Sequence, residues 1–218
     1  MAGVVRYGIP PASALTWRPK ARVAIDRAQL SRDLSRFYDF AGKEVIYVGG
    51  ARHGQLLDPR GIRRLIAVEE NPRAAEPLRA RLAHGVSLME VMVGSFEDVH
   101  KRADVVYFQF CLHEMQGPQK ALTHAWELAS DIVVFDHAAG SEWSFYAAED
   151  QKVARSAEAM TSFGVRRRKQ FVAEQRFRNY AELAAKLLPQ GAPAAERARR
   201  FAGMTNIAIP MRYELALL

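Results

Sequence analysis

Five short apolar segments that alternate with helical stretches constrain the fold of this 218-residue chain more than any other feature. Continuous apolar runs rich in β-branched residues are typical of strands buried in a parallel sheet. Their alternation with helices predicts βαβ units, and therefore a doubly wound α/β fold. The five segments are "EVIYVGG" at 44–50, "RRLIAVEENP" at 63–72, "SLMEVMVGS" at 87–95, "ADVVYFQFCL" at 103–112 and "DIVVFDH" at 131–137.

The last third of the chain adds two strands, "VRRRKQFV" at 165–172 and "NIAIPMRYELALL" at 206–218. They complete a mostly parallel seven-stranded sheet with helices on both faces. Because Pro210 has no N–H to give to a ladder, its strand is expected to begin late or to lie at an edge. Helices are expected at 24–42 with Gly42 as the stop, and at 72–83, 118–129, 148–164, 179–188 and 194–203.

The composition is that of a soluble globular protein, with 49% apolar and 25% charged residues. No apolar run approaches the roughly 20 residues that span a bilayer, and the first residues do not resemble a secretory signal. A single cysteine, Cys111, excludes an internal disulfide. We therefore expect a cytoplasmic protein. The net charge is +7, but the arginines are spread along the chain, which favours a solvated surface over a nucleic-acid interface.

A glycine-rich turn follows the first strand, with Gly49, Gly50, Ala51 and Gly54 in the spacing G-x-A-x-x-G. Such a turn at a helix N-terminus lets the backbone approach a nucleotide closely, although an ordinary strand-to-helix turn would also need a glycine. Glu69 ends the second strand 20 residues after Gly49, the distance at which an acid binds two ribose hydroxyls. The pair fits a nicotinamide dinucleotide or S-adenosylmethionine.

The order of these motifs resembles the class I S-adenosylmethionine-dependent methyltransferases, and in particular their small-molecule group. The resemblance covers residues 24–140. It rests on "VIYVGGARHG" as the glycine motif, "IAVEENP" as the acid followed by a proline, "VMVGSFEDV" as the third strand with its acidic stretch, and "ADVVYFQFCLHEM" as the fourth strand.

This resemblance implies a Rossmann-like methyltransferase fold, S-adenosylmethionine as the cofactor, S-adenosylhomocysteine as the product and a small-molecule acceptor. It divides the chain into an N-terminal arm at 1–23, which could close over the acceptor, and one domain at 24–218. The cofactor-binding half is 24–140 and the acceptor side is 141–218. The implied cofactor-binding residues are Gly49, Gly50, Ala51, Gly54, Glu69, Glu70, Asn71, Ser95, Phe96, Gln109 and Phe110.

Three positions depart from the family's pattern. Tyr47 stands where an acid is usual, Ala51 replaces the second glycine, and Ser95 replaces an aspartate beside the adenine. A serine hydroxyl can still bind the polar edge of adenine, so these departures predict altered cofactor binding rather than none. A site put to another use is the alternative.

Three side chains at the carboxyl edge are candidates for the chemical step: His113, Glu114 and His137. An imidazole near neutral pKa suits the removal of a proton from a phenol, enol or amine. Alternatively, His113 and Glu114 cap the following helix, and His137 is an edge residue bonded to a backbone carbonyl. Asp136 is not paired with His137, because neighbouring strand residues face opposite sides. No His, Asp or Glu spacing indicates a metal.

The function that fits best is methyl transfer to a small molecule, with an RNA or protein methyltransferase and a non-catalytic or dehydrogenase-like nucleotide binder as alternatives. Aromatic residues of the arm and of the segment after the fifth strand could form a lid over the acceptor, or simply pack against the sheet. Nucleic acid and membrane are not expected partners, and a homodimer is among the arrangements the sequence allows. The aromatic residues are Tyr7, Trp17, Trp143, Phe145 and Tyr146.

Overall fold

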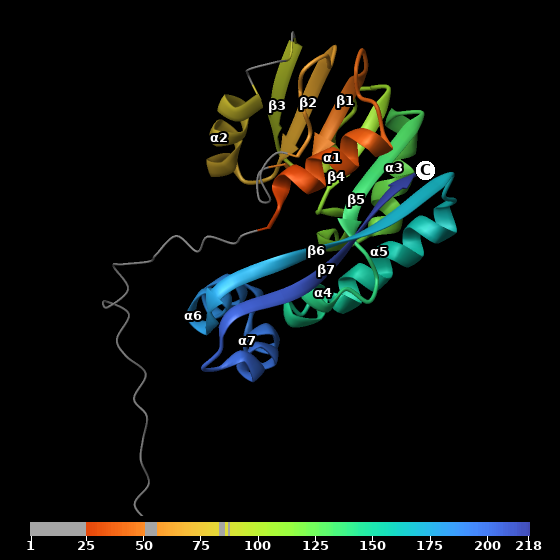
Figure 1. Cartoon of the computed structure of the whole chain (residues 1–218). Coiled ribbons are helices and arrows are strands. Elements are labelled where there is room, and N and C mark those ends of the chain that lie inside the picture. The colour runs from red at the N-terminus through yellow and green to blue at the C-terminus, as the bar shows by residue number, and fades with distance from the viewer. Residues whose placement is uncertain (1–24, 51–55, 83–85, 87) are drawn as a thin grey trace, which may run out of the picture.

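The computed structural model describes residues 25–50, 56–82, 86 and 88–218, and its centre is a seven-stranded sheet in the order β3-β2-β1-β4-β5-β7-β6 (Figure 1). Strands β1 to β5 pair in parallel, whereas β7 is antiparallel to both β5 and β6. The predicted α/β class and mostly parallel sheet are confirmed. The strands are β1 Glu44–Val48, β2 Arg64–Glu69, β3 Leu88–Val93, β4 Val105–Gln109, β5 Asp131–His137, β6 Arg167–Asn179 and β7 Thr205–Leu217.

Helices cover both faces of this sheet, because the buried strands present apolar side chains alternately to each side. In β4, Tyr107 faces a core formed with α1, α2, α4, α6 and α7, while Phe108 faces a second core formed with α3 and α5. The helices are α1 Arg27–Phe37, α2 Pro72–Leu82, α3 Pro118–Leu128, α4 Glu142–Tyr146, α5 Asp150–Phe163, α6 Tyr180–Leu187 and α7 Ala192–Ala198. None of the helices described is long and apolar enough to cross a membrane.

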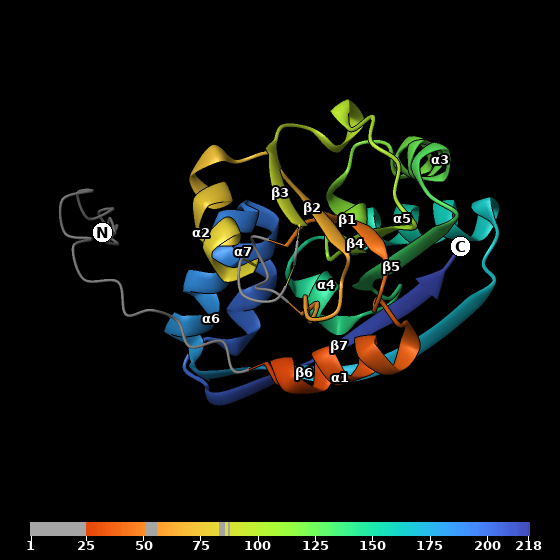
Figure 2. The ribbon, with the colours of Figure 1, turned by 90° about the horizontal axis from the view of Figure 1, so that it is seen from above.

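Strands β6 and β7 run past the parallel strands as a two-stranded extension that carries α6 and α7 at its far end (Figure 1). Seen from above, α1 lies beside them (Figure 2). The Gln29 side chain donates to the Val172 carbonyl at 3.1 Å, and the Tyr213 hydroxyl donates to Asp33 at 2.7 Å. These bonds tie the extension to the first helix.

Several element boundaries differ from the prediction. Helix α1 ends at Phe37, well before Gly42, because Tyr38 is already extended. The short helix α4 was not expected. Strand β7 does not begin late, since Pro210 lies inside it opposite Glu174 of β6. The edge-like setting expected for this proline is nevertheless present, because β5 pairs only with Tyr213 to Leu217 of β7.

Candidate active site

A cavity of about 560 Å³ opens at the carboxyl edge of the sheet, beside the ends of β1, β2 and β4. Its volume is in the range of small-ligand sites. Parallel pairing brings these strand ends together, as the sequence predicted. Eight of the predicted site residues line the cavity: Gly49, Glu69, Glu70, Asn71, Ser95, Phe96, Phe110 and Glu114. Ala51, Gly54 and the arm at 1–23 lie outside the described residues.

The Glu69 carboxylate is fixed at the cavity wall by the turn that follows β2. Its Oε1 accepts a hydrogen bond from the Asn71 backbone N–H at 2.9 Å. The Asn71 side chain in turn accepts from the Arg73 N–H at 3.0 Å, at the start of α2. The acid is therefore held at the cavity wall, at the carboxyl end of β2.

The cavity wall beside Glu69 includes the turn after β3. The Gly94 N–H donates to the Glu69 carbonyl at 3.1 Å, which joins the two strand ends. The Ser95 hydroxyl accepts from the Glu97 N–H at 3.3 Å and begins a short 3₁₀ turn. Phe96 is buried and packs edge-on against Phe108.

Both described glycines of the turn after β1 are required by packing. A Cβ on Gly49, whose φ is +87°, would lie 2.6 Å from the Gln109 carbonyl oxygen. A Cβ on Gly50 would lie 2.4 Å from the Tyr47 ring. Packing within the protein is therefore enough to explain both glycines, without a bound nucleotide. This is what an ordinary strand-to-helix turn would require.

Tyr47 and Gln109 form a buried polar support beneath this turn. The Tyr47 hydroxyl donates to Gln109 Oε1 at 2.8 Å, and the Leu56 backbone N–H donates to the same oxygen at 3.1 Å. Burial raises the pKa of Tyr47, so the phenol stays protonated and can donate. Gln109 was expected to approach the cofactor's sulfur, but its side chain is fully buried and does not line the cavity. The physical reason is that its amide oxygen accepts hydrogen bonds from the Tyr47 hydroxyl and the Leu56 N–H, which keep the side chain inside the protein.

We expect Gly50→Ala to destabilise the protein by about 1–3 kcal/mol, because the new methyl overlaps the Tyr47 ring. Chemical denaturation measures this. Gly117→Ala is the matched control, since the atoms nearest its Cβ would be those of the Lys120 side chain, at 3.5 Å and beyond. Adding Tyr47→Leu should recover part of the loss in Gly50→Ala, and purely additive losses would refute the steric explanation.

Asp136 binds His113 at two points, and sequence reasoning missed this pair. One carboxylate oxygen accepts from the His113 backbone N–H at 3.0 Å, and the other lies 2.5 Å from ring Nδ1. The second oxygen also accepts from the His137 N–H at 2.8 Å. Burial by itself would raise the pKa of Asp136, but the adjacent His113 holds it below its usual range. The parallel pairing of β4 with β5, which places Gln109 beside Phe135, also brings the residues after β4 next to Asp136. This pairing was the signal that could have indicated the contact between Asp136 and His113.

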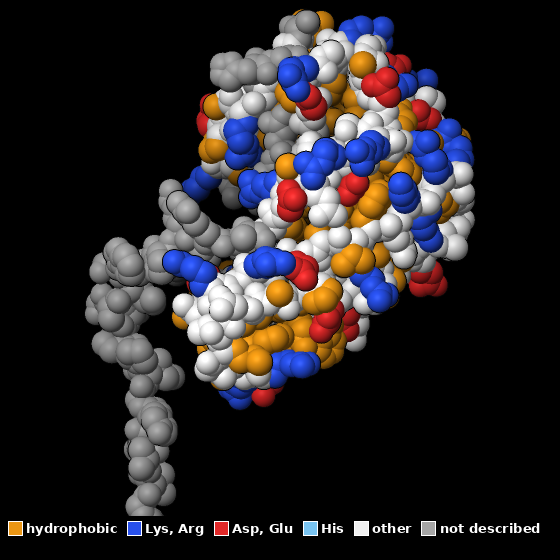
Figure 3. Space-filling model, in the orientation of Figure 1, with side chains coloured by type: hydrophobic (Ala, Val, Ile, Leu, Met, Phe, Trp, Pro, Cys, Tyr) orange, Lys and Arg blue, Asp and Glu red, His pale blue; other side chains and the backbone are white. Residues whose placement is uncertain are grey.

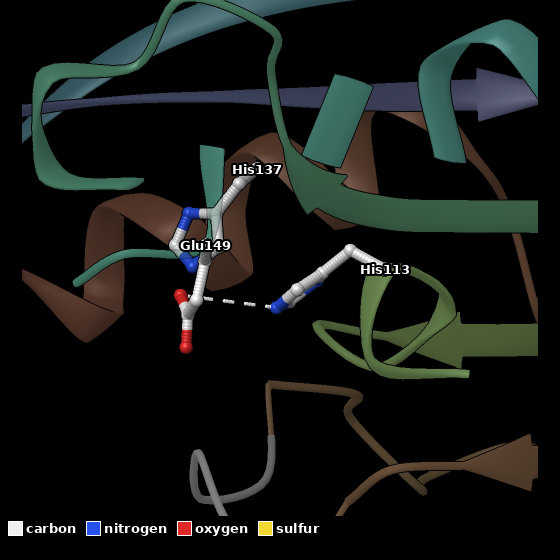
Figure 4. Close-up of side chains that lie close together, drawn as sticks. All are labelled: His113, His137 and Glu149. Atoms are coloured by element: carbon white, nitrogen blue, oxygen red, sulfur yellow. Dashed lines mark ion pairs between the residues drawn. The ribbon is translucent and has the colours of Figure 1, made fainter. Parts of the chain in front are cut away.

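Glu149 completes a buried cluster with the two histidines (Figure 4). It lies between α4 and α5, and its Oε2 is 3.9 Å from His113 Nε2. Burial raises the pKa of Glu149 to about 7. The His113 and His137 rings lie edge-on with centroids 5.3 Å apart. No local pattern in the sequence indicated Glu149, because its neighbours in the cluster come from distant segments.

Phe110 connects the cavity to this cluster. It lines the cavity, and its ring centroid is 4.9 Å from that of His137. Its φ of 47° is an unusual backbone conformation for a phenylalanine, and such conformations are concentrated at functional sites. Glu114 also lines the cavity, and its Oε1 is 3.7 Å from His113 Nε2. The cavity and the cluster of titratable side chains are therefore adjacent.

The structure bears on two of the alternatives for individual residues. His113 and Glu114 lie within the 3₁₀ turn Leu112–Glu114, and helix α3 begins at Pro118 with Gly117 as its N-cap. Trp143 and Tyr146 are buried, with Trp143 stacked on Phe177 and Tyr146 edge-on to Phe201. These two aromatic residues pack as core, whereas the lid residues Tyr7 and Trp17 are outside the described chain.

Solved structures with the same architecture include bacterial and archaeal proteins. A candidate methyltransferase from Bacillus halodurans superposes with a TM-score of 0.62 at 12% identity, over 88% of this chain and 97% of that one. The YcgJ protein from Bacillus subtilis gives a TM-score of 0.61 at 11% identity, over 87% and 97% of the two chains. The chain has the class I methyltransferase fold. No protein-family model and no curated protein matches the sequence.

The methyltransferase fold alone leaves the acceptor open. A candidate RNA methyltransferase from Pyrococcus horikoshii superposes with a TM-score of 0.53 at 16% identity, over 92% of this chain and 88% of that one. The similar structures also include a protein described as a [4+2]-cyclase. Because one fold hosts several reactions, the function has to be argued from the site.

Proposed function

We propose that this protein binds S-adenosylmethionine in the 560 Å³ cavity and transfers its methyl group to a small-molecule acceptor held beside His113, His137 and Glu149. The charge of the cavity wall supports this most directly. The cavity is lined by four glutamates, Glu69, Glu70, Glu97 and Glu114. None of the lining residues described is Lys or Arg. An acidic wall favours a cofactor with a sulfonium and an ammonium group over a dinucleotide with a diphosphate.

The residues of the cavity fit the parts of this cofactor. The Glu69 carboxylate would accept hydrogen bonds from the two ribose hydroxyls, with Asn71, Ser95 and Phe96 around the adenine. The Gly49 backbone and Glu114 would lie beside the methionine part. When bound, the cofactor supplies an electrophilic methyl group on sulfur. The protein then has to align the acceptor with that methyl and exclude water.

An RNA acceptor is the second candidate, supported by the net charge of +7 and by the structure from Pyrococcus horikoshii. The distribution of charge argues against it. Lys and Arg side chains are spread over the face shown in Figure 3, with Asp and Glu among them. RNA-binding sites usually gather basic and aromatic side chains at one place, whereas the cavity wall is acidic.

Transfer of label from methyl-tritiated S-adenosylmethionine tests this function. The protein is incubated with a cellular small-molecule fraction, with total RNA and with a protein fraction in separate reactions. We expect label in the small-molecule fraction, and Glu69→Ala as the matched variant should abolish it. Label found only in RNA or protein would favour those acceptors instead, and no transfer to any fraction would contradict the proposal.

A further inference from the structure

Three buried side chains at the acceptor end of the site point toward one another: His113 after β4, His137 at the end of β5, and Glu149 between α4 and α5 (Figure 4). One possible ligand atom from each lies within 4.8 Å of the others. We propose that His113, His137 and Glu149 bind one divalent transition-metal ion, with Zn²⁺ as the representative ion.

The donor set matches the chemistry of such ions. Two imidazole nitrogens and one carboxylate oxygen are ligands of Zn²⁺ and of related first-row metals. Three protein ligands leave at least one coordination position open, which is the pattern of catalytic rather than structural zinc sites. The trio therefore has the composition of a site that receives a further ligand.

Asp136 orients His113 in the way a metal ligand requires. Its carboxylate is 2.5 Å from Nδ1 of the ring and also accepts from the His113 backbone N–H. With Nδ1 engaged in this way, Nε2 faces the cluster, 3.9 Å from Glu149 Oε2. A carboxylate on the far nitrogen is the usual partner of a metal-binding histidine, because it fixes the tautomer and the ring orientation.

The spacing requires a small closure. Ligand atoms at about 2.0–2.1 Å from a tetrahedral zinc lie about 3.4 Å apart, compared with 3.9 Å between His113 and Glu149 and at most 4.8 Å within the trio. Small rotations of the three side chains would supply this change. A cation would also offset the cost of burying a carboxylate with two polar rings.

No short spacing of His, Asp or Glu in the sequence indicates this site. The three ligands are separated by 24 and 12 positions in the chain, as their numbers show. They lie after β4, at the end of β5 and between α4 and α5, and only the folded sheet brings these places together.

The role of the ion rests on the proposed function, although its binding does not. At the open coordination position, the ion would hold the reacting oxygen of the acceptor and favour its deprotonated form. The acceptor class that fits is a small molecule whose reacting hydroxyl or enol coordinates a divalent cation.

Titration of tag-free, chelator-treated full-length protein with Co²⁺ tests the site, since bound Co²⁺ absorbs visible light according to its geometry. We expect one Co²⁺ per chain, displaced by one Zn²⁺, with His137→Gln and Glu149→Gln each weakening binding at least tenfold. His100→Gln is the matched control, because His100 is exposed, and it should bind as the wild type does. Circular dichroism checks that the variants fold.

The proposal is wrong if the wild-type protein gives no stoichiometric Co²⁺ signal, or if His137→Gln and Glu149→Gln both bind like the wild type. The wild-type result does not depend on the folding of any variant. Titration of the metal-free protein with S-adenosylhomocysteine separates this proposal from the function. A protein that binds that nucleotide but does not bind Co²⁺ refutes the metal site alone. A protein that binds Co²⁺ but does not bind the nucleotide refutes the cofactor alone.

Discussion

Glu69→Ala is expected to weaken the binding of S-adenosylhomocysteine by about 100-fold. A carboxylate that accepts hydrogen bonds from both ribose hydroxyls loses two charge-assisted bonds when truncated, and each contributes about 1.5–3 kcal/mol. A loss of about 3 kcal/mol corresponds to that factor in the dissociation constant. Glu69→Gln keeps one acceptor oxygen and should lie between the wild type and Glu69→Ala. Isothermal titration calorimetry measures all three proteins.

The control for this prediction is Glu76→Ala, which removes an exposed acid from α2 and should not change the affinity. Thermal unfolding must accompany the titrations, because Glu69 also accepts a hydrogen bond from the Asn71 backbone. If Glu69→Ala is folded and binds within threefold of the wild type, Glu69 does not hold the ribose and the orientation proposed for the cofactor is wrong.

Asp136→Asn is expected to lower the free energy of unfolding by about 3 kcal/mol. The carboxylate accepts from three groups, the His113 N–H, the His113 ring and the His137 N–H. An amide of the same shape can turn only one oxygen toward them and places an NH₂ donor against another donor. Leaving such groups buried without a partner costs about 1–3 kcal/mol each, and more where a charge is lost.

Urea unfolding followed by circular dichroism measures this loss. Asp98→Asn is the control, because Asp98 is exposed and should change stability by less than about 0.5 kcal/mol. Combining Asp136→Asn with His113→Gln should cost less than the sum of the single changes, since both remove the same interaction. A loss below about 1 kcal/mol in Asp136→Asn would show that the Asp136–His113 pair contributes little to stability.

The parallel half of the sheet could be predicted because its strands are buried on both sides and therefore read as continuous apolar runs. The "VVYFQ" strand and the "DIVVFDH" strand are found where that pattern places them. The length of β6 could not be predicted in the same way. Beyond Phe171 it is covered on one face, so its buried residues alternate with exposed ones such as Glu174 and Arg176.

The sequence could predict those residues of the candidate site that each lie at the end of a single strand. Glu69, Ser95 and Phe110 line the cavity because strand ends meet at one edge. Contacts between distant side chains were missed, since they depend on packing that no local spacing reveals. Tyr47 stands where an acid was expected, and its hydroxyl instead binds Gln109, 62 residues away. A pair between Asp136 and its sequence neighbour His137 was not expected. The imidazole ring that Asp136 binds is that of His113.

Calorimetric titration of the wild-type protein with S-adenosylmethionine, S-adenosylhomocysteine and NADH tests the central claim most directly. The acidic cavity wall predicts one site per chain with micromolar affinity for the two sulfur nucleotides, and no measurable binding of the diphosphate nucleotide. Binding of NADH, or heat signals from none of the three, would contradict the account. In that case the methyltransferase fold of this chain serves another purpose.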